Sequence, residues 1–147
     1  MRVNIRYEIG ETLPVTVNYD LSLGELFRQA YPSCPSLESL SPRKCGIAKI
    51  EMVLVHYPDD VCSIHVLEEL KAENLRPADL AEAVAFRSQC PGIKHHFIAL
   101  GGILRIERGD CYVPFLSQDG SLELYATPDY PEYQHWASGC YFAAVRN

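Results

Sequence analysis

Short apolar or alternating runs fill the C-terminal third of this chain, and they constrain its fold more than any other feature. From Phe97 onward they read FIALGG, ILRIE, CYVPFL, SLELYA and CYFAAVR, with Gly-Asp or Asp-Gly pairs between some of them. Successive side chains of a β-strand point to opposite faces, so these runs predict short strands joined by turns. The β-branched run 47–57 predicts a longer, central strand.

Two segments between these strands have helical spacing instead. One opens at Ser63 after Pro58, and the other opens with a capping box formed by Asp79 and Glu82 and should end near Cys90. The first helix is expected to bury Ile64, Leu67 and Leu70, and the second to bury Leu80, Ala83, Val84 and Phe86.

The first 46 residues predict additional elements. Residues 3–9 and 13–19 alternate on either side of Gly10, which is typical of a β-hairpin. Ser22 and Glu25 form a second capping box, which predicts a short helix, and the proline- and serine-rich residues 32–46 predict a loop.

The length of 147 residues favours a single domain. A net charge of −6 offers no overall positive field for phosphates, so nucleic acid is not an expected partner. The N-terminus alternates and carries Glu8 and Glu11, unlike a signal peptide, and no run is long and apolar enough to cross a bilayer. We therefore expect no membrane insertion and a location in the cytoplasm or on a virion.

Aromatic residues gather between residues 112 and 142, where eight of the chain's fifteen occur and where Lys, Arg and Asn are absent. Tyrosine and tryptophan give large contact areas while few torsions are fixed, which is why binding surfaces favour them. The stretch 127–139 has two prolines and no period, which predicts a loop between strands. This composition indicates recognition of a partner, although aromatic residues in strands also build cores.

The order of several motifs resembles the variable proteins of diversity-generating retroelements. These motifs are NLRPADLAEAVAF, FIALGG, YVPFL, DGS, a lone Trp136 and the terminal FAAVR, and the resemblance covers residues 47–147. Such proteins are similar in fold to C-type lectins and to formylglycine-generating enzymes. The resemblance implies an α+β, C-type-lectin-like domain over 1–147: two helices packed on small antiparallel sheets, with the N-terminal hairpin and short helix as an extension over 1–46.

The resemblance also implies a function without catalysis. Residues 111–147 would form a ligand-binding region whose surface is rewritten at adenines, and its ligand would be an unidentified macromolecule, expected to be a protein. Carried over by position, the ligand-binding residues are Tyr125, Asp129, Tyr130, Tyr133, His135, Ser138 and Tyr141. The scaffold would keep Val113, Phe115, Leu116, Phe142 and Val145. Tyr141 stands where the family often has arginine. The alternative is an assembly protein that uses the aromatic segment as a permanent oligomer interface.

Catalytic and metal sites find little support in the residues. The oxidases related in fold hold copper with two neighbouring cysteines, and this chain lacks such a pair. Most of its cysteines are expected to be reduced and buried. Cys111 and Cys140 would meet only if their strands were adjacent. His95 and His96 would point to opposite faces of a strand, so we expect no metal, no cofactor and no catalytic residues.

Overall fold

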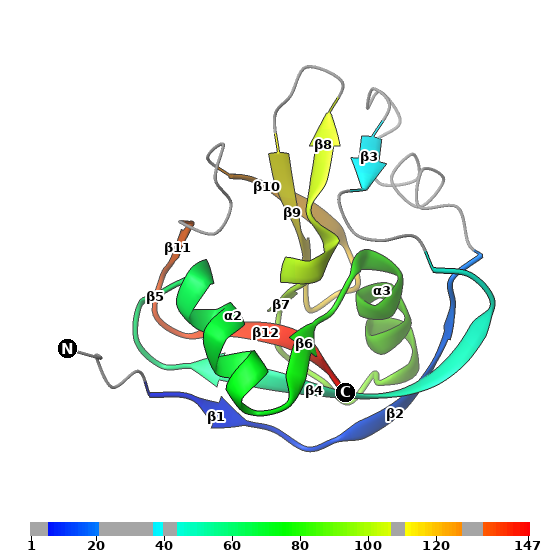
Figure 1. Cartoon of the computed structure of the whole chain (residues 1–147), viewed down its shortest axis with the longest axis horizontal. Helices are drawn as coiled ribbons and strands as arrows, with labels where there is room; N and C mark the ends of the chain where they lie inside the picture. The colour runs from blue at the N-terminus through cyan, green and yellow to red at the C-terminus, as the bar shows by residue number, and fades with distance from the viewer. Residues whose placement is uncertain (1–5, 21–36, 40–43, 107–110, 128–133) are drawn as a thin grey trace.

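The computed structural model describes residues 6–20, 37–39, 44–106, 111–127 and 134–147, which form a mixed α+β structure (Figure 1). Its helices are α2 (Ser63–Ala72), α3 (Leu80–Gln89) and the short 3-10 helix η1 (Leu100–Gly102). Its strands are β1 (Glu8–Ile9), β2 (Leu13–Asn18), β3 (Leu37–Ser39), β4 (Ile47–Tyr57), β5 (Val61–Cys62), β6 (Leu75–Pro77), β7 (Phe97–Ile98), β8 (Leu104–Ile106), β9 (Cys111–Leu116), β10 (Leu122–Thr127), β11 (His135–Trp136) and β12 (Cys140–Arg146).

Most described strands belong to one ten-stranded sheet rather than to the small antiparallel sheets that we expected. The main path runs β1-β4-β12-β7-β9-β8-β3, and β2, β6 and β10 pair with β4, β12 and β9. The last strand, β12, lies in the middle of this path, antiparallel to β4 and parallel to β7 (Figure 1). Because β12 joins strands from both halves of the chain, it merges them into a single sheet. Among the described strands, β5 and β11 form a second, two-stranded sheet.

The two helices cover opposite faces of the β4–β12 pair. Alternate side chains of these strands fall into two clusters, as the period of two in a strand requires. One cluster joins α2 to Val53, Val55, Tyr57, Phe142 and Ala144, and the other joins α3 to Met52, Ala143 and Val145. The second half of β4, from Met52, and the middle of β12, from Phe142 to Val145, are therefore buried or half-buried on both faces, which explains why these parts read as nearly continuous apolar runs.

The predicted N-terminal hairpin is wrong. Both β1 and β2 pair with β4, with Ile9 opposite Val55 and Leu13 opposite Met52, so they are successive parts of one edge strand. The backbone N–H of Gly10 donates to the carbonyl of Leu54 at 2.9 Å and keeps the chain on that edge between the two parts. The alternation was read correctly, but the long strand β4 offers more partners than a hairpin would.

Several predicted elements are confirmed. The central strand is β4 over Ile47–Tyr57, and α3 has the capping box of Asp79 and Glu82 and ends at the cap residue Cys90. Helix α2 begins at Ser63, as expected. It buries Ser63, Val66 and Leu70, whereas Leu67 is exposed, because the face of the helix that packs on the sheet is shifted by about one residue from the predicted face. The expected short helix after Ser22 lies outside the described residues, and the expected loop over 32–46 contains β3.

The free edge of β2 is covered by a side chain from α3. The Gln89 amide accepts a hydrogen bond from the backbone N–H of Thr16 at 2.9 Å and donates one to the carbonyl of Thr16 at 2.6 Å. This pair of bonds copies the pairing that another strand would make, so it removes a donor and an acceptor from an edge where a second chain could add.

Replacement of Gln89 by alanine is expected to increase self-association, because both backbone groups of Thr16 become available to another strand. The expected cost in stability is small, about 1 kcal/mol. Light scattering over a concentration series checks the prediction, with the neighbouring exposed Ser88→Ala as the matched control. Equal scattering by both variants would contradict the role of Gln89 at this edge.

Candidate functional site

A groove of about 350 Å³ opens where β12, β9 and the segment before β7 meet. Strand pairing creates it, because Ile98 of β7 lies opposite both Phe142 of β12 and Phe115 of β9. The residues just before β7 are therefore held beside the start of β12. We call this site the histidine groove; the residues that define it are Lys94, His95, His96, Phe115, Ser138 and Tyr141.

Tyr141 lies between two imidazole rings. The ring of His56, on β4, is 4.3 Å away between centroids and inclined by 16°, and the ring of His95 is 4.1 Å away and inclined by 13°. This stack leaves Tyr141 half-buried. The edge of its ring therefore lines the groove in a fixed position, and the side chain is not freely exposed. The carboxylate of Glu8 is 3.7 Å from Nδ1 of His56 on the far side of the stack.

Tyr125 is the most exposed aromatic residue of the described binding region, with 44% of its surface accessible. Its ring meets Phe115 edge to face at 5.2 Å and Trp136 at 6.1 Å, and Trp136 in turn meets Phe142 at 5.9 Å. Edge-to-face pairs of this kind stabilise the contact beyond burial alone. An unbroken row of rings thus connects the surface at Tyr125 to the core.

Residues 135–136 belong to a strand, not to the irregular loop that we expected over 127–139. In β11, His135 lies opposite Cys62 and Trp136 lies opposite Val61 of β5. The buried indole of Trp136 donates its Nε1–H to the hydroxyl of Ser63 at 2.8 Å, at the start of α2. This bond fixes the segment that carries His135 to a helix remote in sequence.

The structure places four of the seven expected ligand-binding residues, in two groups. Ser138 and Tyr141 line the histidine groove, and Tyr125 contacts the groove residue Phe115. His135 is exposed on β11, on the same strand as Trp136. The remaining positions, Asp129, Tyr130 and Tyr133, lie outside the described residues.

Sequence reasoning missed three residues of this site. His56, His95 and His96 surround Tyr141 and Phe115, and the expected scaffold residue Phe115 also faces the groove. The only signal for His95 and His96 was the His-His pair before an apolar run, and His56 stands alone within β4. Nδ1 of His96 accepts the backbone N–H of Gln118 at 3.1 Å, so the opposite ring nitrogen carries the proton of the neutral ring.

The described thiols show no reactive arrangement. Cys111 and Cys140 lie on β9 and β12, which β7 separates, so their strands are not adjacent. Burial, together with the charge of Asp60, raises the pKa of Cys140 and keeps it a thiol at neutral pH. Of the described cysteines only Cys111 is buried; three are half-buried and Cys45 is exposed, so fewer are buried than we expected. Among the residues that the structure describes, no three His, Cys, Asp or Glu side chains are grouped to hold a metal ion.

The chain matches no protein-family model, no curated protein and no solved structure. Within the described residues, no helix is long and apolar enough to cross a membrane.

Proposed function

We propose that this protein binds a macromolecular ligand without catalysis, through a surface formed by the histidine groove and Tyr125. In this proposal the scaffold is C-type-lectin-like, and a retroelement diversifies the surface from one copy of the protein to another. The observation that carries the proposal is the exposed ring of Tyr125, fixed to the core through Trp136 and Phe142 and contacting a groove residue.

Rigidity of the supporting frame favours binding. Ligand affinity improves when side chains are already held in their bound geometry, because less entropy is lost on association. Tyr141 is clamped by two imidazoles, and Ser138 precedes Gly139, whose positive φ of 89° and bond to the carbonyl of Tyr57 shape the turn. Surface side chains on such a frame can change while the backbone stays in place.

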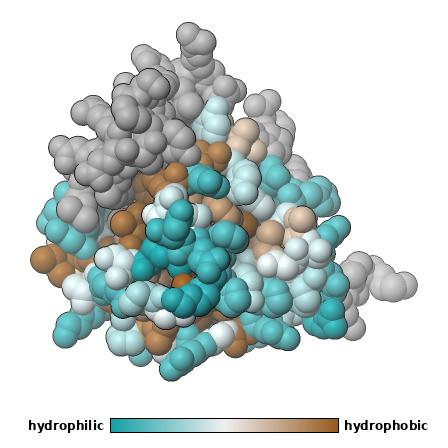
Figure 2. Space-filling model, turned by 180° about the vertical axis from the view of Figure 1, so that it is seen from behind, coloured by the Kyte–Doolittle hydropathy of each residue, from teal (hydrophilic) through white to brown (hydrophobic). Residues whose placement is uncertain are grey.

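The side chains of the groove favour a ligand with polar and aromatic groups. Its defining residues include imidazoles, a hydroxyl, an ammonium and two aromatic rings, and none of them is acidic. Such a set can donate hydrogen bonds and stack on planar groups, as paratopes do. A permanent oligomer interface would instead be broad and apolar. On the side of the molecule opposite to the view of Figure 1, hydrophilic residues cover the middle and hydrophobic ones lie around them (Figure 2).

Replacement of Tyr125 by alanine is expected to weaken ligand binding by about 1–3 kcal/mol, as for a hot-spot tyrosine. The melting temperature should change by only a few degrees, because nearly half of the surface of this residue is already in water. The measurement is affinity capture from cells that carry the gene, with quantification of the enriched proteins. Lys49→Ala, an exposed change on β4 far along the strand from His56, is the matched control.

Loss of the same captured proteins with Tyr125→Ala, and their retention with Lys49→Ala, supports the proposal. Equal capture by both variants would contradict it, and an obligate oligomer in light scattering would favour the assembly alternative. Diversification is tested separately in the flanking DNA, where we expect a reverse transcriptase gene and a near-identical repeat that differs at adenines.

A further inference from the structure

Among the residues that the structure describes, the histidine groove is lined by hydrogen-bond donors and by no carboxylate. The donors are the ammonium of Lys94, the imidazoles of His95 and His96, and the hydroxyl of Ser138. All four residues are exposed. The chain as a whole carries a net charge of −6, so this groove is a local exception on an acidic protein. A negatively charged ligand group is therefore favoured at the groove, although the overall charge of the protein disfavours it.

Three of these donors are available to a ligand in the part of the chain that the structure describes. The ammonium of Lys94 forms no ion pair, and its hydrogen bond to the carbonyl of Pro91 is long, at 3.4 Å, and exposed. Because Nδ1 of His96 accepts from Gln118, the proton of the neutral ring is on Nε2, for which no described residue provides an acceptor. No described residue bonds to the hydroxyl of Ser138.

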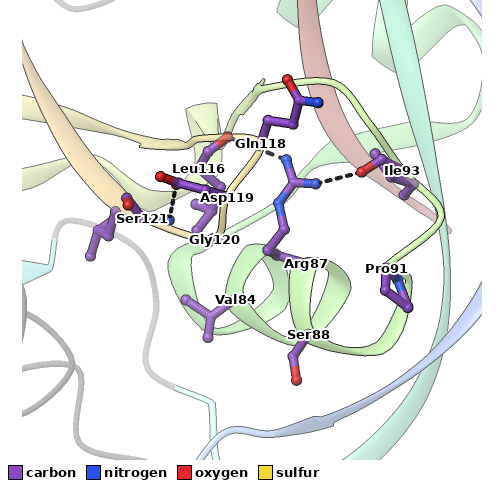
Figure 3. Close-up of a pocket in the computed structure, with 11 residues that line it drawn as sticks. Val84, Arg87, Ser88, Pro91, Ile93, Leu116, Gln118, Asp119, Gly120 and Ser121 are labelled. Atoms are coloured by element: carbon purple, nitrogen blue, oxygen red, sulfur yellow. Dashed lines mark hydrogen bonds between the residues drawn. The ribbon is translucent and has the colours of Figure 1, made fainter.

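Arg87 holds the wall of the groove in place from behind. It lines a larger cavity, of about 590 Å³, and extends from α3 toward Ile93 (Figure 3). Its guanidinium donates to the carbonyls of Ile93, at 2.9 Å, and of His95, the residues on either side of Lys94. A further bond of 3.4 Å to the carbonyl of Leu116 connects this segment to β9. The donors of the groove thus stand on a fixed backbone, which lowers the entropy lost on binding.

The described carboxylates near the groove leave these donors unpaired. Asp119 and Glu123 line a neighbouring hollow together with His96, but neither forms an ion pair with it. The carboxylate of Asp119 accepts instead from two serines of its own turn. Glu8 lies beside His56, on the far side of the ring stack from the groove.

The available donors suit a carboxylate better than a phosphate. Phosphate sites in proteins commonly use the fork of an arginine or the backbone N–H groups of a helix N-terminus. In the described part of the chain, neither an arginine nor a helix N-terminus lines this groove. One ammonium, with imidazole and hydroxyl donors beside it, matches the single charge and the two acceptor oxygens of an Asp or Glu side chain.

We propose that the histidine groove binds an acidic segment of a protein. Asp or Glu side chains of this segment accept from Lys94, His96 and Ser138, and its other side chains pack on the rings of Phe115 and Tyr125, which meet edge to face beside these donors. The inference rests on the proposed function, because it names the chemistry of the ligand at the same surface.

The test is titration of the ¹⁵N-labelled full chain, at low salt of about 20 mM, with a short acetylated and amidated peptide made only of glutamate. We expect saturable shifts of the backbone amide signals of His95, His96 and Ser138. Peptides of glutamine and of lysine of the same length are expected to bind at least about tenfold more weakly. Raising the salt to about 300 mM should weaken binding of the glutamate peptide, because exposed charges are then screened.

Lys94→Gln removes the positive charge of the groove without removing a buried contact, because Lys94 is exposed and its bond to Pro91 is long. We expect its affinity for the glutamate peptide to fall about threefold, as for an exposed charge pair. Lys49→Gln, the same loss of charge at an exposed position of β4 outside the groove, should leave the affinity unaltered. Equal affinity of the two variants would overturn the proposal, as would the absence of saturable shifts up to about 5 mM peptide.

Failure of this inference can be told from failure of the proposed function. If the glutamate peptide does not bind while Tyr125→Ala still loses its captured proteins, the acidic segment is wrong and the proposed function stands. If the peptide binds at the groove while Tyr125→Ala captures the same proteins as the wild type, the preference of the groove for acidic segments is supported and the proposed function is contradicted.

Discussion

Replacement of Glu82 by alanine is expected to lower the free energy of unfolding by about 3–5 kcal/mol. Glu82 is fully buried in α3, where its carboxylate accepts from both Nη atoms of Arg76 at 2.9 and 2.6 Å and from the hydroxyl of Tyr19 at 2.6 Å. It also accepts from the backbone N–H of Asp79 in the capping box. Removal of the carboxylate leaves these donors and the charge of Arg76 without their partner.

The acid dependence of stability provides a second measurement of the same residue. Burial raises the pKa of Glu82, but hydrogen bonds from Arg76, Asp79 and Tyr19 outweigh it and lower the pKa to about 2. A lowered folded-state pKa stabilises the protein above pH 4.5, and this contribution is lost as the pH falls from there to about 2. Asp79 acts in the opposite direction, because burial and the charge of Glu82 raise its pKa.

Urea unfolding at pH 7 and at pH 3 tests both expectations. The exposed Glu68→Ala on α2 is the matched control and should change stability by less than about 0.5 kcal/mol. Glu82→Gln keeps the shape of the side chain but should remove most of the loss between the two pH values. A Glu82→Ala variant as stable as the control would show that the pair with Arg76 contributes nothing.

Replacement of Gly101 by alanine is expected to destabilise the fold by about 1–3 kcal/mol or more, because the change overpacks a site bounded by backbone. A Cβ on Gly101 would lie 2.6 Å from the carbonyl oxygen of Pro77 and 2.8 Å from that of Ala78. The backbone N–H of Gly101 donates to the same Ala78 carbonyl at 2.9 Å, so the two segments cannot separate without losing this bond.

Gly92→Ala is the matched control for this change. Nothing lies within 4 Å of a Cβ built on Gly92, and alanine there should leave the midpoint of thermal unfolding nearly unchanged. The measurement is thermal unfolding by circular dichroism for both variants. If Gly101→Ala unfolded at the same temperature as Gly92→Ala, the close approach of η1 to the end of β6 would not be required by the fold.

Local signals in the sequence were enough to predict most individual elements. The capping box of Asp79 and Glu82 forms within four residues, and β4 follows from its β-branched run, so neither depends on distant contacts. The partners of the strands could not be predicted in this way. The parallel pairing of Phe142 with Ile98 and the pairing of both β1 and β2 with β4 join residues far apart in the chain.

The site was predicted less completely for the same reason. Tyr125 and Ser138 are exposed, as their turn and edge positions indicated. His95 becomes part of the groove only because β7 lies between β12 and β9, which no pattern around His95 encodes. The half-buried position of Tyr141 depends on two imidazoles from other segments. Composition indicated a candidate region, and non-local pairing decides which of its side chains meet.

The central place of β12 has a consequence for synthesis in the cell. Residues 140–146 leave the ribosome after every other strand of the sheet, although β4, β6 and β7 all bond to them. Until then β4 has an open, apolar edge, which is prone to aggregation in nascent chains. Stable tertiary structure must therefore form after translation of this segment. Chaperone binding during translation would protect the unpaired edge of β4.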